Sequence, residues 1–368
     1  MATYRFLAYD LRTNVAIAEL PLADVRFGGV LNGVGSLSAS CPLDAAGVWA
    51  TATTPERTII YVERDGVLLE GAGYIVWGRR RSAAADTGFA AMLSGAQIPS
   101  YLRRNRLVAT ATFAAIDQLT IARALVTALQ AQPGGDIGIN VGTGTSGVLR
   151  DRTYPAHERK NIGDALAQLA EVSNGFDWAV DVAWSAGAPS KSLTLSYPRR
   201  GRIAGSTGIV FQTGKNLLGY DIEEDGSRSA RSVDTLGAGD GSDQLVSTAT
   251  RTDLIDAGYP LTAETLAFKD VSVQATLDEH AIAAVNARAA TPQFWRLTVA
   301  ADDVDGGLGH WIVGDDCLLV IDDDPYFPRQ SDGQPGYLGY HRIVEYSVSV
   351  PTEGVETVEV ILGHVASA

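Results

Sequence analysis

The chain has 368 residues, of which 46% are hydrophobic and 20% charged. This composition argues against a disordered chain, and the length predicts about two to four domains. Its 29 basic and 43 acidic side chains give a net charge of −14, which argues against a general nucleic-acid binder because such proteins need a basic surface. The charge is uneven: residues 1–160 carry 16 basic and 13 acidic side chains, whereas residues 161–368 carry 13 and 30.

The two cysteines, Cys41 and Cys317, are too few for a disulfide framework or a four-cysteine metal site. Both lie beside apolar runs, so we expect buried free thiols. No segment approaches the roughly 18 uninterrupted apolar residues of a membrane helix, and the first residues lack the apolar core of a signal peptide. We therefore expect a soluble protein made in a reducing compartment.

Residues 1–100 show the pattern of short strands separated by glycine-rich turns. A β-prone run at 57–64 is separated from a second run at 67–69 by Asp65-Gly66, which predicts a hairpin because the tight turn needs positive φ angles. Residues 25–42 carry several glycines before an alternating apolar segment. The range 1–100 is predicted to be an N-terminal β domain, either a small barrel, as we expect, or a sandwich.

Residues 101–197 change to a helical period. Apolar residues at helical spacing predict one helix through 121–129, and a second at 162–170 with Asn161 as its N-cap. Two alternating strands follow, and their inward-facing positions are predicted to be Phe176, Trp178, Val180, Val182 and Trp184 in the first and Leu193, Leu195 and Tyr197 in the second. This range is predicted to be an α+β domain with two helices on a small sheet.

The last two ranges are a connector and a second β domain. Residues 198–275 are rich in glycine, serine and aspartate, and predict a connector with a few strands and an exposed loop at 236–243. A capping box, Thr276-Leu277-Asp278-Glu279, predicts the start of one more helix that ends before Pro292. Alternating strands around Trp295, Val348 and Val360, the last after a turn at 351–354, complete the C-terminal domain 276–368. The predicted fold class is mainly β with an α+β middle, in which two β regions bracket a small helix-on-sheet domain.

No arrangement of reactive residues points to catalysis. The five histidines lie in unrelated elements without the paired spacing of a zinc helix; they are His157, His280, His310, His341 and His364. The glycine-rich segments 142–147 and 237–241 lack the pattern of a phosphate or dinucleotide loop, and we interpret both as ordinary loops.

The acidic clusters do not form a recognisable metal site. Asp302 to Gly307 fails the spacing of a calcium loop, because alanine and isoleucine fall where ligands belong. Asp315-Asp316 and Asp322-Asp323-Asp324 flank an apolar strand, and we interpret them as charged turn residues rather than ligands of a divalent ion. No pair of carboxylates is singled out for sugar hydrolysis. We therefore assign no catalytic, cofactor-binding or metal residue and predict that the chain is not an enzyme.

Arginines concentrate at Arg79-Arg80-Arg81 and in Tyr101-Leu102-Arg103-Arg104-Asn105-Arg106. Such clusters bind phosphate backbones or stabilise protein interfaces. Since the rest of the chain is acidic, we favour a contact between subunits.

Several motifs in a fixed order carry a resemblance to a known family. They are Leu31–Ser38 (LNGVGSLS), Val62–Gly66 (VERDG), Asp117–Arg123 (DQLTIAR), Asn161–Leu166 (NIGDAL) and Leu195–Gly201 (LSYPRRG), followed by the closing hairpins. In this order the chain resembles, over nearly its whole length, the baseplate-hub-type minor tail proteins of long non-contractile-tailed bacteriophages, especially those infecting actinobacteria. The sequence shows no recognisable C-terminal peptidase or lysozyme-like extension of the kind in longer relatives, so we do not expect one.

The resemblance implies a structural protein of the virion tail tip, assembled in the host cytoplasm. It implies a homotrimer with two tail-tube-like barrels per subunit, so that three subunits form a pseudo-sixfold ring. That ring would join the sixfold tail tube and distal tail protein to a threefold central fibre or spike, and would contact the C-terminus of the tape measure protein. DNA would pass through its channel without specific binding, and we expect the acidic surface of residues 161–368 to line part of that channel.

Two alternatives stay open. The first is a peripheral receptor- or carbohydrate-binding tail protein, with sugar-stacking faces supplied by tryptophans, namely Trp49, Trp77, Trp178, Trp184, Trp295 and Trp311. Three of these, Trp178, Trp184 and Trp295, occupy inward positions of alternating strands, which favours a role in the core. The second alternative is a wall-degrading enzyme.

Overall fold

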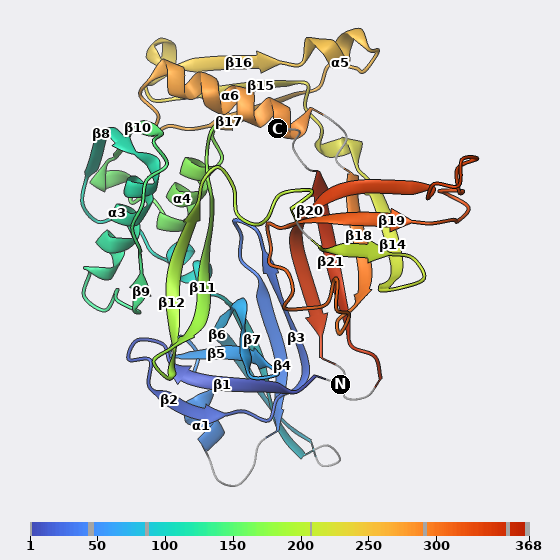
Figure 1. Cartoon of the computed structure of the whole chain (residues 1–368). Coiled ribbons are helices and arrows are strands. Elements are labelled where there is room, and N and C mark those ends of the chain that lie inside the picture. The colour runs from blue at the N-terminus through green and yellow to red at the C-terminus, as the bar shows by residue number, and fades with distance from the viewer. Residues whose placement is uncertain are drawn as a thin grey trace.

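The computed structural model describes residues 2–42, 48–84, 88–206, 208–289, 293–350 and 354–364. Four parts of the chain are arranged side by side (Figure 1): an N-terminal β half, a middle unit, a small unit and a C-terminal β half. The fold is mainly β with few helices, as the sequence predicts.

The N-terminal β half comprises β1 to β7 and one short helix. Its elements are β1 (Tyr4–Asp10), β2 (Ala16–Glu19), β3 (Ala23–Val30), β4 (Ser36–Pro42), α1 (Val48–Ala52), β5 (Thr58–Arg64), β6 (Val67–Ala84) and β7 (Gly88–Gln97). The hairpin predicted at Asp65-Gly66 joins β5 to β6, and both turn residues have positive φ angles, of 51° and 85°. That prediction is confirmed.

The middle unit follows and contains the two predicted helices. Its elements are α2 (Pro99–Arg104), β8 (Ala111–Asp117), α3 (Gln118–Gln130), β9 (Ile139–Asn140), β10 (Leu149–Tyr154), η1 (Ala156–Glu158), α4 (Ile162–Ala170), β11 (Asp177–Ser185) and β12 (Ala188–Ser196). The side chain of Asn161 caps α4 by accepting from the N–H of Asp164 at 3.1 Å, as predicted. On β11, Trp178, Val180 and Val182 are buried as predicted.

Two inward assignments on the strands β11 and β12 are wrong. Trp184 is 38% exposed and its indole N–H donates to Glu63 at 3.2 Å, and Tyr197, just after β12, is equally exposed. Each is the last residue of the alternating pattern of its own strand, and the two lie at opposite ends of the β11–β12 pair.

The C-terminal β half and the small unit alternate along the chain. The C-terminal β half consists of β13 (Val210–Gln212), β14 (Leu217–Glu224), β18 (Gln293–Ala300), β19 (Asp316–Ile321), β20 (Tyr337–Ser349) and β21 (Thr357–His364). The small unit is inserted between β14 and β18, and consists of η2 (Gly226–Arg228), β15 (Ser232–Leu236), η3 (Gly241–Asp243), β16 (Val246–Thr250), α5 (Thr252–Asp256), β17 (Ala263–Ala267) and α6 (Gln274–Arg288).

This arrangement groups some elements differently from the ranges expected from the sequence. The range 198–275 supplies β13 and β14 to the C-terminal sheet, and the helix expected after 275 packs on β15 and β16 of the small unit. The capping box at Thr276 is wrong: α6 begins at Gln274 with no side-chain cap, and Thr276 is buried in its first turn. Pro292 and residues 351–353 of the expected turn lie outside the described residues.

One continuous sheet joins the two β halves. In the described residues its strand order is β14-β18-β21-β20-β3-β4-β7-β6-β5-β1-β2, with β19 and β13 beyond the first part of β20. The connection is an antiparallel pairing of β20 with β3, from Glu345 opposite Val30 to Ser349 opposite Arg26. A single hydrophobic core lies on one face of this sheet and contains residues of both halves, among them Phe27, Tyr74 and Trp295.

The same strand order occurs twice within this sheet. In the N-terminal β half, β3-β4-β7-β6-β5 are neighbours in that order, and in the C-terminal β half β14-β18-β21-β20-β19 are. If the five strands of each set are numbered 1 to 5 along the chain, their order across the sheet is 1-2-5-4-3 in both sets. The chain therefore contains an internal structural repeat.

A second core lies where the middle unit covers the N-terminal β half. Outward residues of β1, β5 and β6, including Leu7, Tyr61 and Ile75, pack against α3, α4 and β11. The described residues contain no helix that is long and apolar enough to span a membrane.

Candidate functional site

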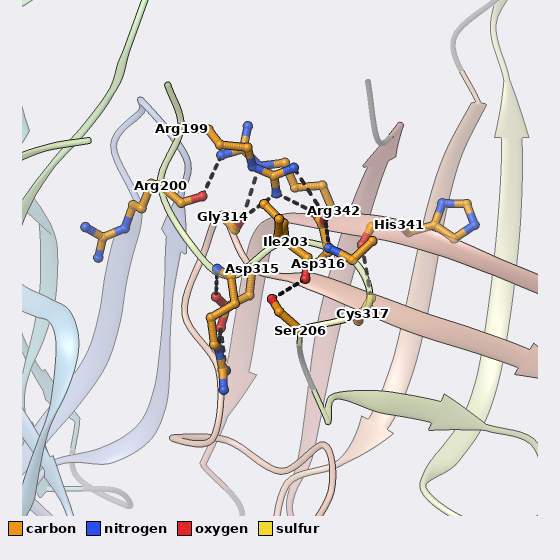
Figure 2. A network of polar contacts seen from close by, with 12 residues as sticks. Arg199, Arg200, Ile203, Ser206, Gly314, Asp315, Asp316, Cys317, His341 and Arg342 are labelled. Atoms are coloured by element: carbon orange, nitrogen blue, oxygen red, sulfur yellow. Dashed lines mark hydrogen bonds and ion pairs between the residues drawn. The ribbon is translucent and has the colours of Figure 1, made fainter. Parts of the chain in front are cut away.

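A dense cluster of polar residues lies where the middle unit meets the C-terminal β half. Figure 2 shows the centre of this junction network, which we define by its arginines and its acids: Arg199, Arg200, Arg202, Arg342, Asp177, Asp181, Asp315 and Asp316. Arg199 reaches across to Asp316 of β19 and Arg202 to Asp315 just before it, and Arg342 of β20 reaches back to Asp177 of β11.

Asp315 and Asp316 are not the solvated turn residues expected from the sequence. They are 1% and 0% exposed, respectively. Asp316 forms an ion pair with Arg199 and accepts from the N–H of Ala204 at 2.7 Å, while Asp315 pairs with Arg202 at 2.6 Å. Burial without these partners would be strongly unfavourable, because an isolated charge loses its hydration. The two acids therefore hold the chain after β12 against the start of β19.

Asp177 ties three parts of the chain together. It accepts from the backbone N–H of Arg200 at 2.7 Å and from the Asn32 side chain at 2.7 Å, and it pairs with Arg342. Asn32 also accepts from the N–H of Trp178 at 2.7 Å. Asn32 and Asp177 therefore connect β3, β11 and β20 through charged or amide groups at one point.

A cavity of about 270 Å³ lies beside this network, between the two β halves and the middle unit. Its walls are mostly apolar or aromatic, including Trp178, Trp311 and Tyr346, with Glu70, Asp181 and Arg200 at the polar end. Arg200 donates to Glu70 at 2.6 Å and to Asp181 at 2.8 Å, so one guanidinium serves two carboxylates. Burial and the neighbouring Asp181 charge raise the pKa of Glu70 to about 7.

A second polar junction joins the middle unit to the small unit. Arg150 and Arg152 are buried on β10; Arg150 pairs with Glu279 of α6, and Arg152 lies 3.3 Å from Nε2 of His280. The ring of Phe268 stacks on His280 at 4.1 Å. Burial, together with the two arginines, lowers the pKa of His280 to about 3, so the imidazole is neutral and accepts from Arg152.

The histidines, cysteines and acidic segments were considered in the sequence as ligands but not assigned to a site. Among the residues that the structure describes, no three histidine, cysteine, aspartate or glutamate side chains are placed to hold a metal ion. Asp303, in the acidic segment, accepts from the N–H groups of Asp305 and Gly306 and so closes a turn. Cys41 and Cys317 are both buried, as predicted, and neither forms a disulfide with another described residue.

The glycine-rich segment 142–147 is held by the protein itself. Asp117, which caps α3, also accepts from the N–H groups of Ser146 and Gly147 at 2.8 Å each. Arg123 donates to the carbonyls of Thr143 and Gly144. An acidic residue therefore occupies the place where a phosphate loop would bind its ligand.

The two arginine segments lie on different elements. Arg80 and Arg81 are exposed on the outer part of β6, while Arg79 bonds to the carbonyl of Ala50 at 2.7 Å. In the second segment, Arg104 stacks on Trp77 at 4.0 Å. The first segment lies along an open strand, the second on α2.

Part of the outer face of the continuous sheet is exposed, while elsewhere on this face the middle unit covers β1, β5 and the first part of β6. We call the exposed part the open face. Rows of registered residues define this open face, running Asp221–Arg296–Ile361–Glu345 in the C-terminal β half and Ser349–Arg26–Ser38–Ser94 across the junction. The residues between these rows point the other way, into the core. The open face is acidic in the C-terminal β half, where Glu223 and Glu359 are also exposed, and rich in serine in the N-terminal β half.

Sequence reasoning missed the junction network and the cavity. The sequence does contain a signal, namely Arg199-Arg200 after one strand and Asp315-Asp316 before another. Because more than a hundred residues separate the arginines from the aspartates, the sequence does not show that they pair. The tryptophans of the sugar-binding alternative are mainly structural: Trp178, Trp295 and Trp311 are buried.

No protein-family model and no curated protein sequence matches the chain. Solved structures do resemble it over nearly its whole length. The 43 kDa tail protein of prophage MuSo2 from Shewanella oneidensis has a TM-score of 0.59 at 10% identity and covers 98% of each chain. A tail protein from Neisseria meningitidis MC58 has a TM-score of 0.58 at 13% identity and covers 98% of this chain and 96% of that one.

A third similar structure is the prophage tail protein gp18 from Listeria monocytogenes EGD-e. Its TM-score is 0.56 at 11% identity, over 99% of this chain and 95% of that one. At such identities the likeness establishes the fold. The chain therefore has the fold seen in these tail proteins, with both β halves and the units between them included in the match.

Proposed function

We propose that the chain is a structural hub of a phage tail tip. Three copies form a ring that joins the sixfold tail tube and distal tail protein to a threefold central fibre or spike. The observation that carries this proposal is the internal repeat, in a chain whose fold matches tail proteins end to end. Two repeats in each of three copies present six similar surfaces on one side, while the copies themselves keep threefold symmetry.

In this ring the open face lines the channel through which DNA leaves. Its acidic part, with Asp221, Glu345 and Glu359, repels the phosphate backbone and prevents DNA from adhering. Its serine-rich part presents small side chains that leave the lumen wide. The C-terminus of the tape measure protein contacts the same ring before DNA is released.

The role is structural and non-catalytic. The charged groups of the junction network form ion pairs with one another and hold the units of the chain in place. The protein is assembled in the host cytoplasm and acts at the virion tail tip, with baseplate proteins of the long-tailed, non-contractile type as its partners.

Electron microscopy of the tail tip, with this subunit carrying a small density label, tests the proposal. We expect three labels around the axis where the tail tube ends. A label on peripheral fibres, or a different number around the axis, would contradict the hub. A hub with three labels but a basic lumen would overturn the channel assignment alone.

A further inference from the structure

The strands β6 and β20 hold the same place in the two repeats, but β20 has one more neighbour. Its outer part, Glu345 to Ser349, pairs with β21 on one side and with β3 on the other. Beyond Val76, β6 pairs with β7 alone among the described residues. The other edge of residues 78–82 is therefore open, whereas the matching edge of β20 is occupied by β3.

Two features align β6 with β20 residue by residue. Each has a β-bulge toward its fifth strand, at Val76–Gly78 and at Ile343–Glu345. The first residue of each bulge also accepts through its carbonyl from the segment before the third strand: from Glu56 at 2.7 Å in one repeat and from Gly314 at 2.8 Å in the other. Counting from the bulges, Arg80 corresponds to Ser347.

The same counting aligns β14 with β3. Arg26 lies opposite Ser38, and Asp221 opposite Arg296, in equivalent rows of the two repeats. Two residues further on, Glu223 corresponds to Gly28. Within the chain Ser347 faces Gly28, so the repeat predicts that Arg80 of one copy faces Glu223 of another.

The charges on the two open edges are opposite. The outer part of β6 carries Arg79-Arg80-Arg81, and β14 carries Asp221, Glu223 and Glu224. β14 is the terminal strand of the sheet, with β18 as its neighbour. Pairing β6 with β6, or β14 with β14, would place like charges opposite each other, which is unfavourable. Only a head-to-tail contact brings the basic edge to the acidic one.

We propose that β6 of one copy pairs antiparallel with β14 of a second copy, continuing the sheet in the register that sets Arg80 opposite Glu223. The contact repeats between copies what β20 and β3 do within one copy. Such a heterologous contact forms a closed ring or an open filament, and its closure at three copies rests on the proposed function. The open face then runs without interruption around the ring.

Disulfide trapping with the full chain tests the register. The variant Arg80→Cys/Glu223→Cys, oxidised mildly at high protein concentration, is expected to give disulfide-linked oligomers that a reducing agent separates into single chains. The matched control is Arg80→Cys/Glu224→Cys, whose second cysteine is one residue away and on the opposite face of β14; it should link at least about tenfold less. Equal linking in both variants, or none in the first, would overturn the proposed pairing.

A charge swap tests the same contact without cysteine. We expect Arg80→Glu and Glu223→Arg each to weaken self-association, measured by sedimentation, about tenfold, and the double variant to restore it. Arg12→Glu, an exposed change elsewhere on the N-terminal β half, should leave it unchanged. Failure of the double variant to recover would overturn the pairing.

The two proposals fail differently. Trapped oligomers that are open filaments would support the β6–β14 pairing and contradict the trimeric hub. Trimers without the Arg80–Glu223 link would support the hub and overturn the pairing, and a chain that remains monomeric and unlinked at high concentration would overturn the pairing as well.

Discussion

Gly201 and Gly314 approach each other so closely that a Cβ atom on Gly201 would lie 2.3 Å from the carbonyl carbon and oxygen of Gly314. Both have positive φ angles, of 87° and 109°. Their contact brings the backbone after β12 against the backbone before β19, and Arg199 and Arg342 both donate to the Gly314 carbonyl. The junction network therefore depends on glycine at positions 201 and 314 as well as on its ion pairs.

Gly201→Ala is expected to destabilise the chain by about 3 kcal/mol or more, since it adds a backbone clash to the strain of a positive φ. Gly205→Ala is the matched control, because Gly205 has a φ of 80° and no atom within 4 Å of its Cβ position. It should cost only about 1 kcal/mol. Urea unfolding measures both, and similar losses in the two variants would contradict the proposed close contact.

Asp316→Asn is expected to lower the free energy of unfolding by about 3 kcal/mol, because it leaves the Arg199 guanidinium without its buried counter-charge. Asp253→Asn removes an exposed partner of Arg251 and should leave the stability nearly unchanged. Thermal unfolding of the two variants beside the unchanged chain is the measurement. A loss in Asp316→Asn no larger than that of the control would refute the structural role of this ion pair.

Glu70 is expected to make stability fall as the pH rises through neutrality. Its pKa in the folded chain is about 7, against an ordinary value of 4.5, so the folded state holds the proton more tightly than the unfolded state. The proton is therefore released on unfolding between these values, and the stabilisation present below pH 4.5 is lost as the pH approaches 7. Above pH 7, Glu70 and Asp181 are both negatively charged and are paired with the single positive charge of Arg200.

Urea unfolding between pH 5 and 8 measures this effect, which the 39% exposure of Glu70 moderates. The variant Glu70→Gln keeps a hydrogen-bonding group and should flatten the profile. An unchanged profile in this variant would assign the pH dependence to another group.

His280 is expected to act in the opposite direction. Its folded pKa of about 3 lies below the ordinary value of 6.5 because Arg150 and Arg152 face it from β10 and the site is buried. The stabilisation is present above pH 6.5 and is lost as the pH falls toward 3. The imidazole should show no titration by NMR above about pH 4, and His280→Gln should be less sensitive to acid than the unchanged chain. A midpoint near 6 would disprove burial against the two arginines.

Local patterns predicted most of the elements, because turns, caps and alternation are set by neighbours in the sequence. The Asp65-Gly66 hairpin, the Asn161 cap and the burial of Trp178 all follow from a few residues. The start of α6 did not, since Thr276 fits a capping box but is buried within the helix instead.

The long-range partnerships were beyond these patterns. Asp315 and Asp316 resemble solvated turn residues until Arg199 and Arg202, more than a hundred positions earlier, are placed beside them. The insertion of the small unit between β14 and β18 likewise moved a helix away from the strands that follow it in sequence. The arginine segment 79–81 is visible in the sequence, but the unpaired edge of β6 on which it lies follows only from the strand order of the sheet.

The pairing of β20 with β3 also has a consequence for synthesis on the ribosome. The edge of β3 is complete once residue 30 has emerged, but its partner follows only at Glu345. At about 5–20 residues per second, that edge waits roughly 15–65 s for its own strand. During this interval the exposed Arg26 and the glycines at 28 and 29 make it a poor template for another nascent chain. The sequence of β3 therefore has to protect this strand from pairing with other chains until its own partner, β20, has been synthesised.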